Sequence, residues 1–503
     1  MSKNFRVLAV SGQTIISICT VLAFFFALFI DFTSSPFGGY ADQRFALVTL
    51  CGSLIVALTS MLFFQPPTNL KSAILHLVPS SLLCSAFLLL AAPFHSKLYA
   101  WAEPGMYICF FFSAILIGAW LSWTDASIKF AKFLSAAAAV FCVTYGLASV
   151  NVYLFAISDG VTNLVDYLPW GFVNIRYWNH IATWCLPLLP LAALIEPLNR
   201  HRLWQMLLLI GAAIWWWMLF LSAGRGSFLA IVFGVIVVVV VMGRKSFPWV
   251  NILLAHFLVG VLLWLLLSVA LPSLMAGGVN VSSVKTDASG RLPLFIEAWR
   301  MSIQNFPLGM GPQSWLTHEI LTDGYLNSKK FGHPHNMYLM WAAEYGWLLI
   351  ACLGLVVAQA MRHFFKARLR LASARDSERL LMLTAITASV SSALFHAGGS
   401  AVFMAPASML VGLFVLAAFW GLVIPGRDDG IYLIHRSSRR HIRGFIALTL
   451  ALGLSTTWLL WMKDIWSYYE AMRIDEEHYF ETVGEGILPR FWFHGNFPRQ
   501  SAQ

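Results

Sequence analysis

Charged side chains are scarce in this chain. They make up 11% of its 503 residues, whereas hydrophobic residues make up 59% and the mean hydropathy is +0.72. Soluble globular domains carry about 25% charged residues. Apolar runs alternate with short loops along the whole sequence, which excludes a soluble enzyme held by a single anchor. The composition therefore predicts a polytopic membrane protein with one membrane domain.

Loop cysteines are absent as well. All seven cysteines fall within apolar runs, which argues against a disulfide framework and against a thiolate metal site. The first apolar run, residues 7–30, is longer than a signal-peptide core and lacks a small-residue cleavage site, so we expect it to be a retained first span.

Apolar runs near the length of about 20 residues that a membrane helix needs recur throughout the sequence. They predict an all-α bundle of about 12–13 spans. Beyond the first, the expected spans are residues 45–64, 72–92, 105–123, 130–155, 180–197, 204–222, 226–242, 250–271, 337–360, 380–397, 403–424 and 444–462. We divide the chain into a membrane domain, 1–462, and an acidic, aromatic tail, 463–503, which we expect along the outer membrane surface.

The net charge of +10 comes from basic residues that concentrate in alternate loops. With the N-terminus inside, most of the 33 basic residues fall in the predicted cytoplasmic loops, as the positive-inside rule requires. Anionic lipid explains these loops better than nucleic acid does. The same orientation places the long segment 272–336 on the outer side of the membrane.

Segment 272–336 is too long for a passive connector. Its apolar residues recur at helical spacing, at Leu292, Phe295, Ile296, Trp299 and Ile303. We predict an amphipathic helix that Ser289 and Gly290 cap and that residues 305–307, Asn-Phe-Pro, end. Residues 309–312, Gly-Met-Gly-Pro, follow no strand and form a turn, not a dinucleotide site.

The run His333-Pro334-His335-Asn336 ends this segment where the next span begins. A histidine near its ordinary pKa takes a proton from an attacking hydroxyl, so His335 is a candidate general base. The alternatives are a helix-capping or solvated side chain. Asn336 either caps the following helix or orients a substrate. The two histidines lack the third ligand that zinc requires, so we expect no metal.

Glu344 is a carboxylate within the span that follows. It lies nine residues beyond His335, about half a turn out of phase on an ideal helix. An ionisable group inside a membrane span is usually paired or functional. We expect a structural pair with an arginine.

Several arginines on the outer side are candidate anion ligands. Arg225 lies between Gly224 and Gly226, which let the backbone turn tightly, and its planar guanidinium suits phosphate oxygens. The alternative is an arginine that reaches to lipid headgroups. Arg291 and Arg300 are nine residues apart and cannot share one stripe; we favour Arg291, at the helix start. Further candidates, for anion binding or interfacial anchoring, are Arg176 and Arg44.

The outer side offers a base and arginines but no pair of carboxylates. A hydrolytic glycosidase needs two facing carboxyl groups. A departing diphosphate needs cations that stabilise its negative charge. The inventory therefore favours glycosyl transfer from a diphosphate lipid over hydrolysis.

Four stretches of the sequence resemble the bacterial O-antigen ligase family, part of a superfamily of lipid-linked-oligosaccharide ligases, polymerases and protein O-oligosaccharyltransferases. They are Phe172 to Pro187 with its Phe-x-Asn and Leu-Pro, Ser222 to Leu229, Ser289 to Gly311, and His335-Asn336 to Gly346. The sequence departs from the family pattern after Gly346, where Trp-Leu-Leu replaces a second glycine and a threonine. An extra last span and the long tail are also atypical.

The resemblance implies a GT-C-like inner-membrane glycosyltransferase for lipopolysaccharide assembly, without metal or nucleotide cofactor. It would move an O-antigen glycan from undecaprenyl diphosphate to a sugar hydroxyl of the lipid A-core, on the periplasmic face. His335 would be the base, and Arg225 and Arg291 would hold the diphosphate. The substrate-binding candidates are Asn336, Arg176, Arg300, Arg44 and His333.

Three alternatives stay open at this point. An O-antigen polymerase and a protein O-oligosaccharyltransferase share the chemistry and differ in the acceptor. A transporter or flippase for a lipid-linked glycan is of another class. It should bury ionisable groups near the membrane midplane, where the spans offer His76, His256, Glu344 and His396.

Overall fold

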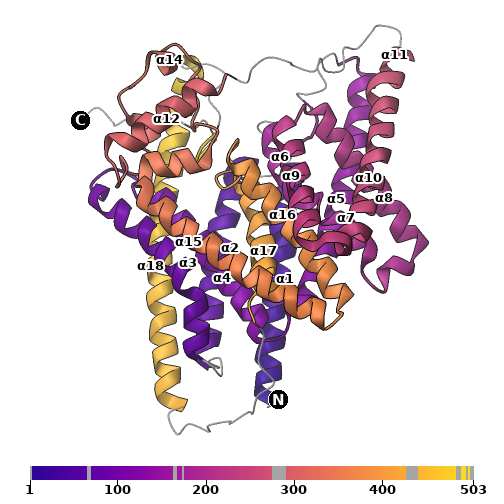
Figure 1. Cartoon of the computed structure of the whole chain (residues 1–503). Coiled ribbons are helices and arrows are strands. Elements are labelled where there is room, and N and C mark those ends of the chain that lie inside the picture. Colours follow the sequence, from indigo (N-terminus) through magenta and orange to yellow (C-terminus); the bar gives the residue numbers. More distant parts are fainter. Residues whose placement is uncertain are drawn as a thin grey trace.

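A computed structural model describes residues 3–34, 36–64, 70–161, 167–172, 175–274, 290–425, 440–482, 489–493, 495 and 497–498. Within these residues the secondary structure is helical and no strand occurs, so the predicted all-α membrane fold is confirmed. Figure 1 shows the long helices running side by side, with short helices α12 and α14 gathered at one end. We call this end of the bundle the α12 end.

The elements follow in chain order. The first half contains α1 (Lys3–Phe29), η1 (Ile30–Phe32), α2 (Gly39–Phe64), α3 (Leu70–Ala91), η2 (Ala92–Phe94), α4 (Ala102–Trp123), α5 (Ser127–Ser158), α6 (Ile175–Cys185), α7 (Leu189–Leu194), η4 (Leu198–Arg200), α8 (Arg202–Leu221) and α9 (Arg225–Met242). The second half contains η5 (Gly243–Ser246), α10 (Phe247–Trp264), η6 (Leu265–Ala270), α11 (Leu271–Leu274), α12 (Leu292–Gln304), α13 (Ser314–Thr317), α14 (Asp323–Leu326), α15 (Met337–Ser373), α16 (Ser377–Ala397), α17 (Pro406–Val423) and α18 (Arg440–Thr482).

Eleven segments of the described chain are long and apolar enough to cross a membrane. One of them, Arg225–Leu274, holds two successive helices, α9 and α10. The predicted span at 180–197 is wrong, because α6 and α7 are separate helices of 11 and 6 residues. Pro187 and Pro190 lack the N–H groups that would continue the helix. Such a break is tolerated in a membrane where protein surrounds it, and residues 177–193 are buried.

Helix α17 forms the centre of the bundle and α18 its edge. The most apolar window of α17 is 89% buried, against 11% for the window of α18. Helices α4, α16 and α6 pack around α17. The approach of α4 is close: a Cβ at Gly118 would lie 2.7 Å from the Ala417 carbonyl oxygen. The elements around α17 therefore form the core of the bundle.

The predicted amphipathic helix is confirmed as α12, Leu292–Gln304. Ser289 lies outside the described residues, and the residue at the N-cap position is Arg291. The apolar stripe that predicted the helix remains 44% or more exposed at Leu292, Ile296, Trp299 and Ile303. The buried face is a different one, made by Leu294, Ala298 and Met301, which pack with Trp315, Tyr325 and Ala343.

Helix α15 is broken at Gly346, where φ is +81°. A Cβ there would lie 2.1 Å from the Pro307 carbonyl oxygen, so only glycine lets the two backbones meet. The carbonyl that the break leaves free at Ala343 accepts a hydrogen bond from Met310 N over 2.8 Å. The predicted turn at residues 309–312 therefore fastens the end of α12 to the start of α15.

The tail was expected along the outer membrane surface; the structure shows part of it as a helix and part of it buried in the bundle. Helix α18 continues to Thr482, about twenty residues beyond the predicted end of the last span. Farther on, Pro489, Arg490, Phe491 and Trp492 are buried inside the bundle. The physical reason is a set of hydrogen bonds and ion pairs to α2, α4, α6 and α15, described below.

Candidate functional site

His335 lies in a short loop, residues 331–336, directly before α15. Its side chain is 2% exposed. Its backbone adopts φ +58°, a left-handed conformation that a residue with a side chain rarely takes. His335 N donates to His333 Nδ1 over 3.1 Å, and the Asn336 side chain accepts from Leu339 N over 3.0 Å. The predicted cap at Asn336 is confirmed.

Two side chains from elsewhere hold this loop. Trp315 Nε1 donates to the Phe331 carbonyl over 2.8 Å, and Arg490 Nη1 donates to the Gly332 carbonyl over 3.3 Å. The Phe331 ring packs edge-on against the imidazole of His335, with the ring centroids 5.1 Å apart. In the described part of the chain, His335 Nδ1 is buried and makes no hydrogen bond. A buried polar atom without a hydrogen bond requires an explanation, and a catalytic role is one of the explanations that apply to such atoms.

Arg225 begins α9, after the turn that follows α8. Asn179 of α6 holds both sides of this turn: Ser222 Oγ donates to its Oδ1 over 2.9 Å, and Ser227 Oγ donates to its carbonyl over 3.1 Å. A Cβ at Gly226 would lie 3.3 Å from His396 Nε2, so the turn also lies against the end of α16. The flanking glycine thus brings Arg225 to the α6–α16 contact.

Arg291 occupies the N-cap position of α12 and is half-buried. Its Nη1 donates to the Gly399 carbonyl over 2.8 Å, in the loop that follows α16. Arg300, nine residues on, is exposed on the same helix. The structure therefore brings Arg291 to the elements around Arg225 and leaves Arg300 at the surface.

A second pair of histidines lies beside these arginines. His180 Nε2 is 2.7 Å from Ser400 Oγ, and His396 Nδ1 is 3.0 Å from Thr183 Oγ1. The two imidazole centroids are 5.1 Å apart. The sequence interpretation gave these histidines no catalytic role. The spacing of Arg176 and His180, one helical turn apart, was a signal that α6 turns two polar groups to one face.

The electrostatic coupling shows which groups gather around His335. Burial, followed by the charges of Arg291 and Arg176, lowers the pKa of His335 to about 3. Burial also lowers the pKa of Arg291, with Arg176 and Arg225 as the next causes. His335 is therefore uncharged at neutral pH, and the nearby charges of Arg291 and Arg176 favour an anion at this place.

Arg44 lies elsewhere. Its side chain is fully buried, and it donates to the carbonyls of Phe491 and Met404 over 3.0 and 2.8 Å. The guanidinium also lies over the Phe491 ring, 4.7 Å from its centroid. These contacts make Arg44 an anchor for the tail, so we leave it out of the proposed substrate site.

Glu344 makes the predicted structural pair with an arginine. The partner is Arg490 of the tail, whose Nη2 lies 2.6 Å from Glu344 Oε1 and 2.9 Å from Glu103 Oε2. The expectation that Glu344 pairs with an arginine is confirmed. Among the described residues, no group of three or more histidine, cysteine, aspartate or glutamate side chains is arranged to hold a metal ion.

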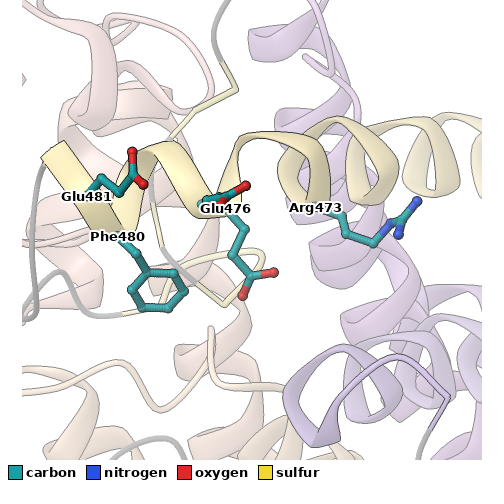
Figure 2. Close-up of a pocket in the computed structure, with 5 residues that line it drawn as sticks. Arg473, Glu476, Phe480 and Glu481 are labelled. Atoms are coloured by element: carbon teal, nitrogen blue, oxygen red, sulfur yellow. The ribbon is translucent and has the colours of Figure 1, made fainter.

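A surface pocket at the far end of α18 is a poor candidate for the same chemistry. Figure 2 shows Arg473, Glu476, Phe480 and Glu481 projecting from the last turns of this helix, where Glu477 completes the lining. Three carboxylates against one guanidinium repel a diphosphate. The cationic site beside His335 remains the candidate.

Comparison with known families supports the same region. Residues 207–354 match the family model described as O-antigen ligase. This stretch contains Arg225, Arg291 and His335, whereas Arg176 and Arg490 lie outside it. A comparison with curated proteins finds no match. The match supports an O-antigen ligase- or polymerase-type activity in a multi-pass membrane protein, and it shows that residues 207–354 are similar to the O-antigen ligase family.

Proposed function

We propose that the chain is an O-antigen ligase that transfers a glycan from undecaprenyl diphosphate to a sugar hydroxyl of the lipid A-core. The observation that carries the proposal is a buried, neutral His335, with one ring nitrogen unpartnered in the described chain, beside the charges of Arg291 and Arg176. The charge of Arg225 lowers the pKa of Arg291, which indicates that Arg225 belongs to the same site. The site thus combines a proton acceptor with ligands for a diphosphate.

In the proposed step the acceptor hydroxyl oxygen attacks the anomeric carbon of the glycan. The bond from that carbon to the diphosphate oxygen breaks, and its electron pair leaves with the undecaprenyl diphosphate. The hydroxyl proton passes to His335. Arg225 and Arg291 stabilise the charge that develops on the leaving group, while Arg176 and Asn336 contribute further contacts to the substrates.

The pKa of His335 in the free protein lies well below the neutral range that suits a general base, and donor binding acts on it. Burial and the charges of Arg291 and Arg176 keep the free imidazole unprotonated. A bound diphosphate brings negative charge next to the arginines, which offsets their effect and raises the pKa of His335. The base therefore gains proton affinity when the donor is in place.

The proposal places the α12 end at the periplasmic face of the bacterial inner membrane. The uneven distribution of basic residues between alternate loops supports this orientation. A polyprenyl carrier and a lipid-anchored acceptor then both reach the site from the membrane plane. The chemistry uses side chains alone and calls for neither metal nor nucleotide.

The test is transfer by the purified protein in liposomes. Undecaprenyl-diphosphate glycan is supplied with lipid A-core, with a second glycan lipid, or with a pilin-like protein, and a gel shift shows which acceptor gains sugar. Modification of lipid A-core supports ligation. Modification of the glycan lipid alone or of the protein alone would replace it by polymerisation or protein glycosylation. Movement of the donor across the membrane without any transfer would make the chain a flippase.

A further inference from the structure

The tail residues Pro489, Arg490, Phe491 and Trp492, which we call the tail anchor, are buried in the membrane domain. Three side chains bind the backbone carbonyls of the anchor. Tyr177 of α6 donates to Pro489 over 2.9 Å, Tyr40 of α2 to Arg490 over 2.6 Å, and Arg44 of α2 to Phe491 over 3.0 Å. The anchor is therefore fixed along its backbone by helices that precede it by more than 300 residues.

The Arg490 side chain reaches farther into the bundle. Its Nε and Nη2 each bind one carboxylate oxygen of Glu103, over 2.8 and 2.9 Å, and Nη2 also meets Glu344. Its remaining donor, Nη1, binds the Gly332 carbonyl. All three charged side chains are at most 1% exposed. Burial alone would lower the pKa of Arg490, but Glu103 and Glu344 raise it well above its ordinary value, so the guanidinium stays charged.

These contacts lie on both sides of His335 in the sequence. Gly332 precedes His335 in its loop, and Glu344 follows it in α15. Glu344 Oε1 also accepts from Trp315 N over 3.1 Å, and the Trp315 indole holds the Phe331 carbonyl. One guanidinium thus connects the two flanks of the histidine, directly and through Trp315.

The backbone conformation of His335 requires contacts of this kind to hold it. A non-glycine residue at φ +58° costs free energy, and it persists only where the surroundings enforce it. A planar guanidinium satisfies Glu103, Glu344 and Gly332 together, because its donors point in different directions. An ammonium group is a point charge without that fork. The geometry at Arg490 is therefore specific to arginine.

We propose that the tail anchor is a positioning element of the catalytic site, and that Arg490 holds the His335 loop in its working conformation. The proposal rests on the proposed role of His335 as the base. Arg490 lies 136 residues beyond the end of the region that matches the O-antigen ligase family model, residues 207–354. The tail then supplies a residue on which the chemistry depends, although it touches neither substrate.

The first test compares Arg490→Lys with Arg473→Lys in the full chain. Arg473 lies on α18 and is exposed, paired with Glu470, so its replacement keeps the charge and should leave transfer unchanged. For Arg490→Lys we expect kcat to fall at least about tenfold while the KM for the donor changes less than about threefold, because misplacing a catalytic group costs rate more than binding. An unchanged kcat in a protein that still needs His335 would overturn the inference and leave the proposed function intact.

The second test separates positioning from charge balance. The triple variant Arg490→Met, Glu103→Gln, Glu344→Gln removes the buried charges together and should fold, since a neutral replacement of a buried ion network is tolerated. Hydrogen exchange of a peptide covering residues 328–340 should be faster than in the wild type, with exchange of α16 unchanged and kcat still low. Restored kcat with wild-type exchange would overturn the inference, and so would loss of folded protein in both Arg490 variants.

Discussion

Arg490 and the arginines near His335 have opposite surroundings in this membrane protein. Arg490 lies fully inside the bundle and binds two carboxylates. Arg291 is half-buried, donates to the Gly399 carbonyl, and lies near the charges of Arg176 and Arg225. Among the described residues, no carboxylate pairs with Arg291. A buried guanidinium keeps its carboxylates paired, so that its loss alone destabilises the fold, whereas positive charges that repel one another gain free energy from a bound anion.

The largest expected effect is a loss of stability when the cation that neutralises Glu103 and Glu344 is removed. Arg490→Ala leaves Glu103 and Glu344 buried without their cation, which should lower the free energy of unfolding by about 3–5 kcal/mol. Thermal unfolding in detergent measures it. Arg473→Ala, a matched change on exposed α18, should stay within about 0.5 kcal/mol of wild type. Equal losses in both variants would show that the buried ion pairs of Arg490 matter no more for stability than an exposed one.

His335→Ala should abolish transfer and leave the protein folded. Loss of a general base costs about a hundredfold to ten-thousandfold in rate, and the buried side chain has one ring nitrogen that makes no hydrogen bond in the described chain. The gel shift of the acceptor measures turnover, and thermal unfolding checks the fold. His201→Ala, at an exposed histidine before α8, is the matched control and should transfer normally. Turnover near wild type in His335→Ala would take the base out of the mechanism.

Arg291→Lys should weaken the donor site without breaking the fold. The lysine keeps the charge but loses the planar fork, and we expect kcat/KM to fall about tenfold, as for one hydrogen bond to a charged group. Steady-state transfer at several donor concentrations measures it. Arg300→Lys, on the exposed part of the same helix, should behave as wild type. If the two variants lose activity equally, α12 contributes no specific ligand.

The smallest effect is expected from pH. Because the pKa of His335 in the free protein is lowered to about 3, the base is already deprotonated at pH 5. Between pH 7.5 and 5, kcat/KM should therefore change less than about twofold, whereas a histidine of pKa 6.5 would lose about thirtyfold. A bound diphosphate raises the pKa, so the acid limb of kcat should lie at higher pH than that of kcat/KM. A limb near pH 6.5 in kcat/KM would contradict the buried, cation-lined site.

Local patterns in the sequence predicted local features well. The apolar spacing from Leu292 gave α12 its bounds, and an asparagine before an apolar run correctly predicted the cap at Asn336. Glu344 was expected to pair with an arginine because a lone carboxylate inside a membrane span is too costly. Each of these predictions depends on residues within a few helical turns.

Features that depend on packing between distant segments were missed. The sequence did not show which face of α12 would be buried: Ala298 and Met301 pack with Ala343 of α15, while Trp299 remains half exposed. The contact between His180 and His396 was missed because α6 and α16 are far apart in the sequence. The sequence around Arg44 did not indicate that this residue would bind the tail.

Hydropathy and charge distribution in the sequence determined a helical membrane protein and its basic loops, because burial in lipid acts on each segment separately. Only the tertiary structure decided that Arg490 would be the partner of Glu344 and that Arg291 and Arg176 would be the arginines whose charges act on His335. Electrostatic attraction and hydrogen bonding act over a few ångströms in space, whatever the separation along the chain, so these partners became visible only once the helices were packed together.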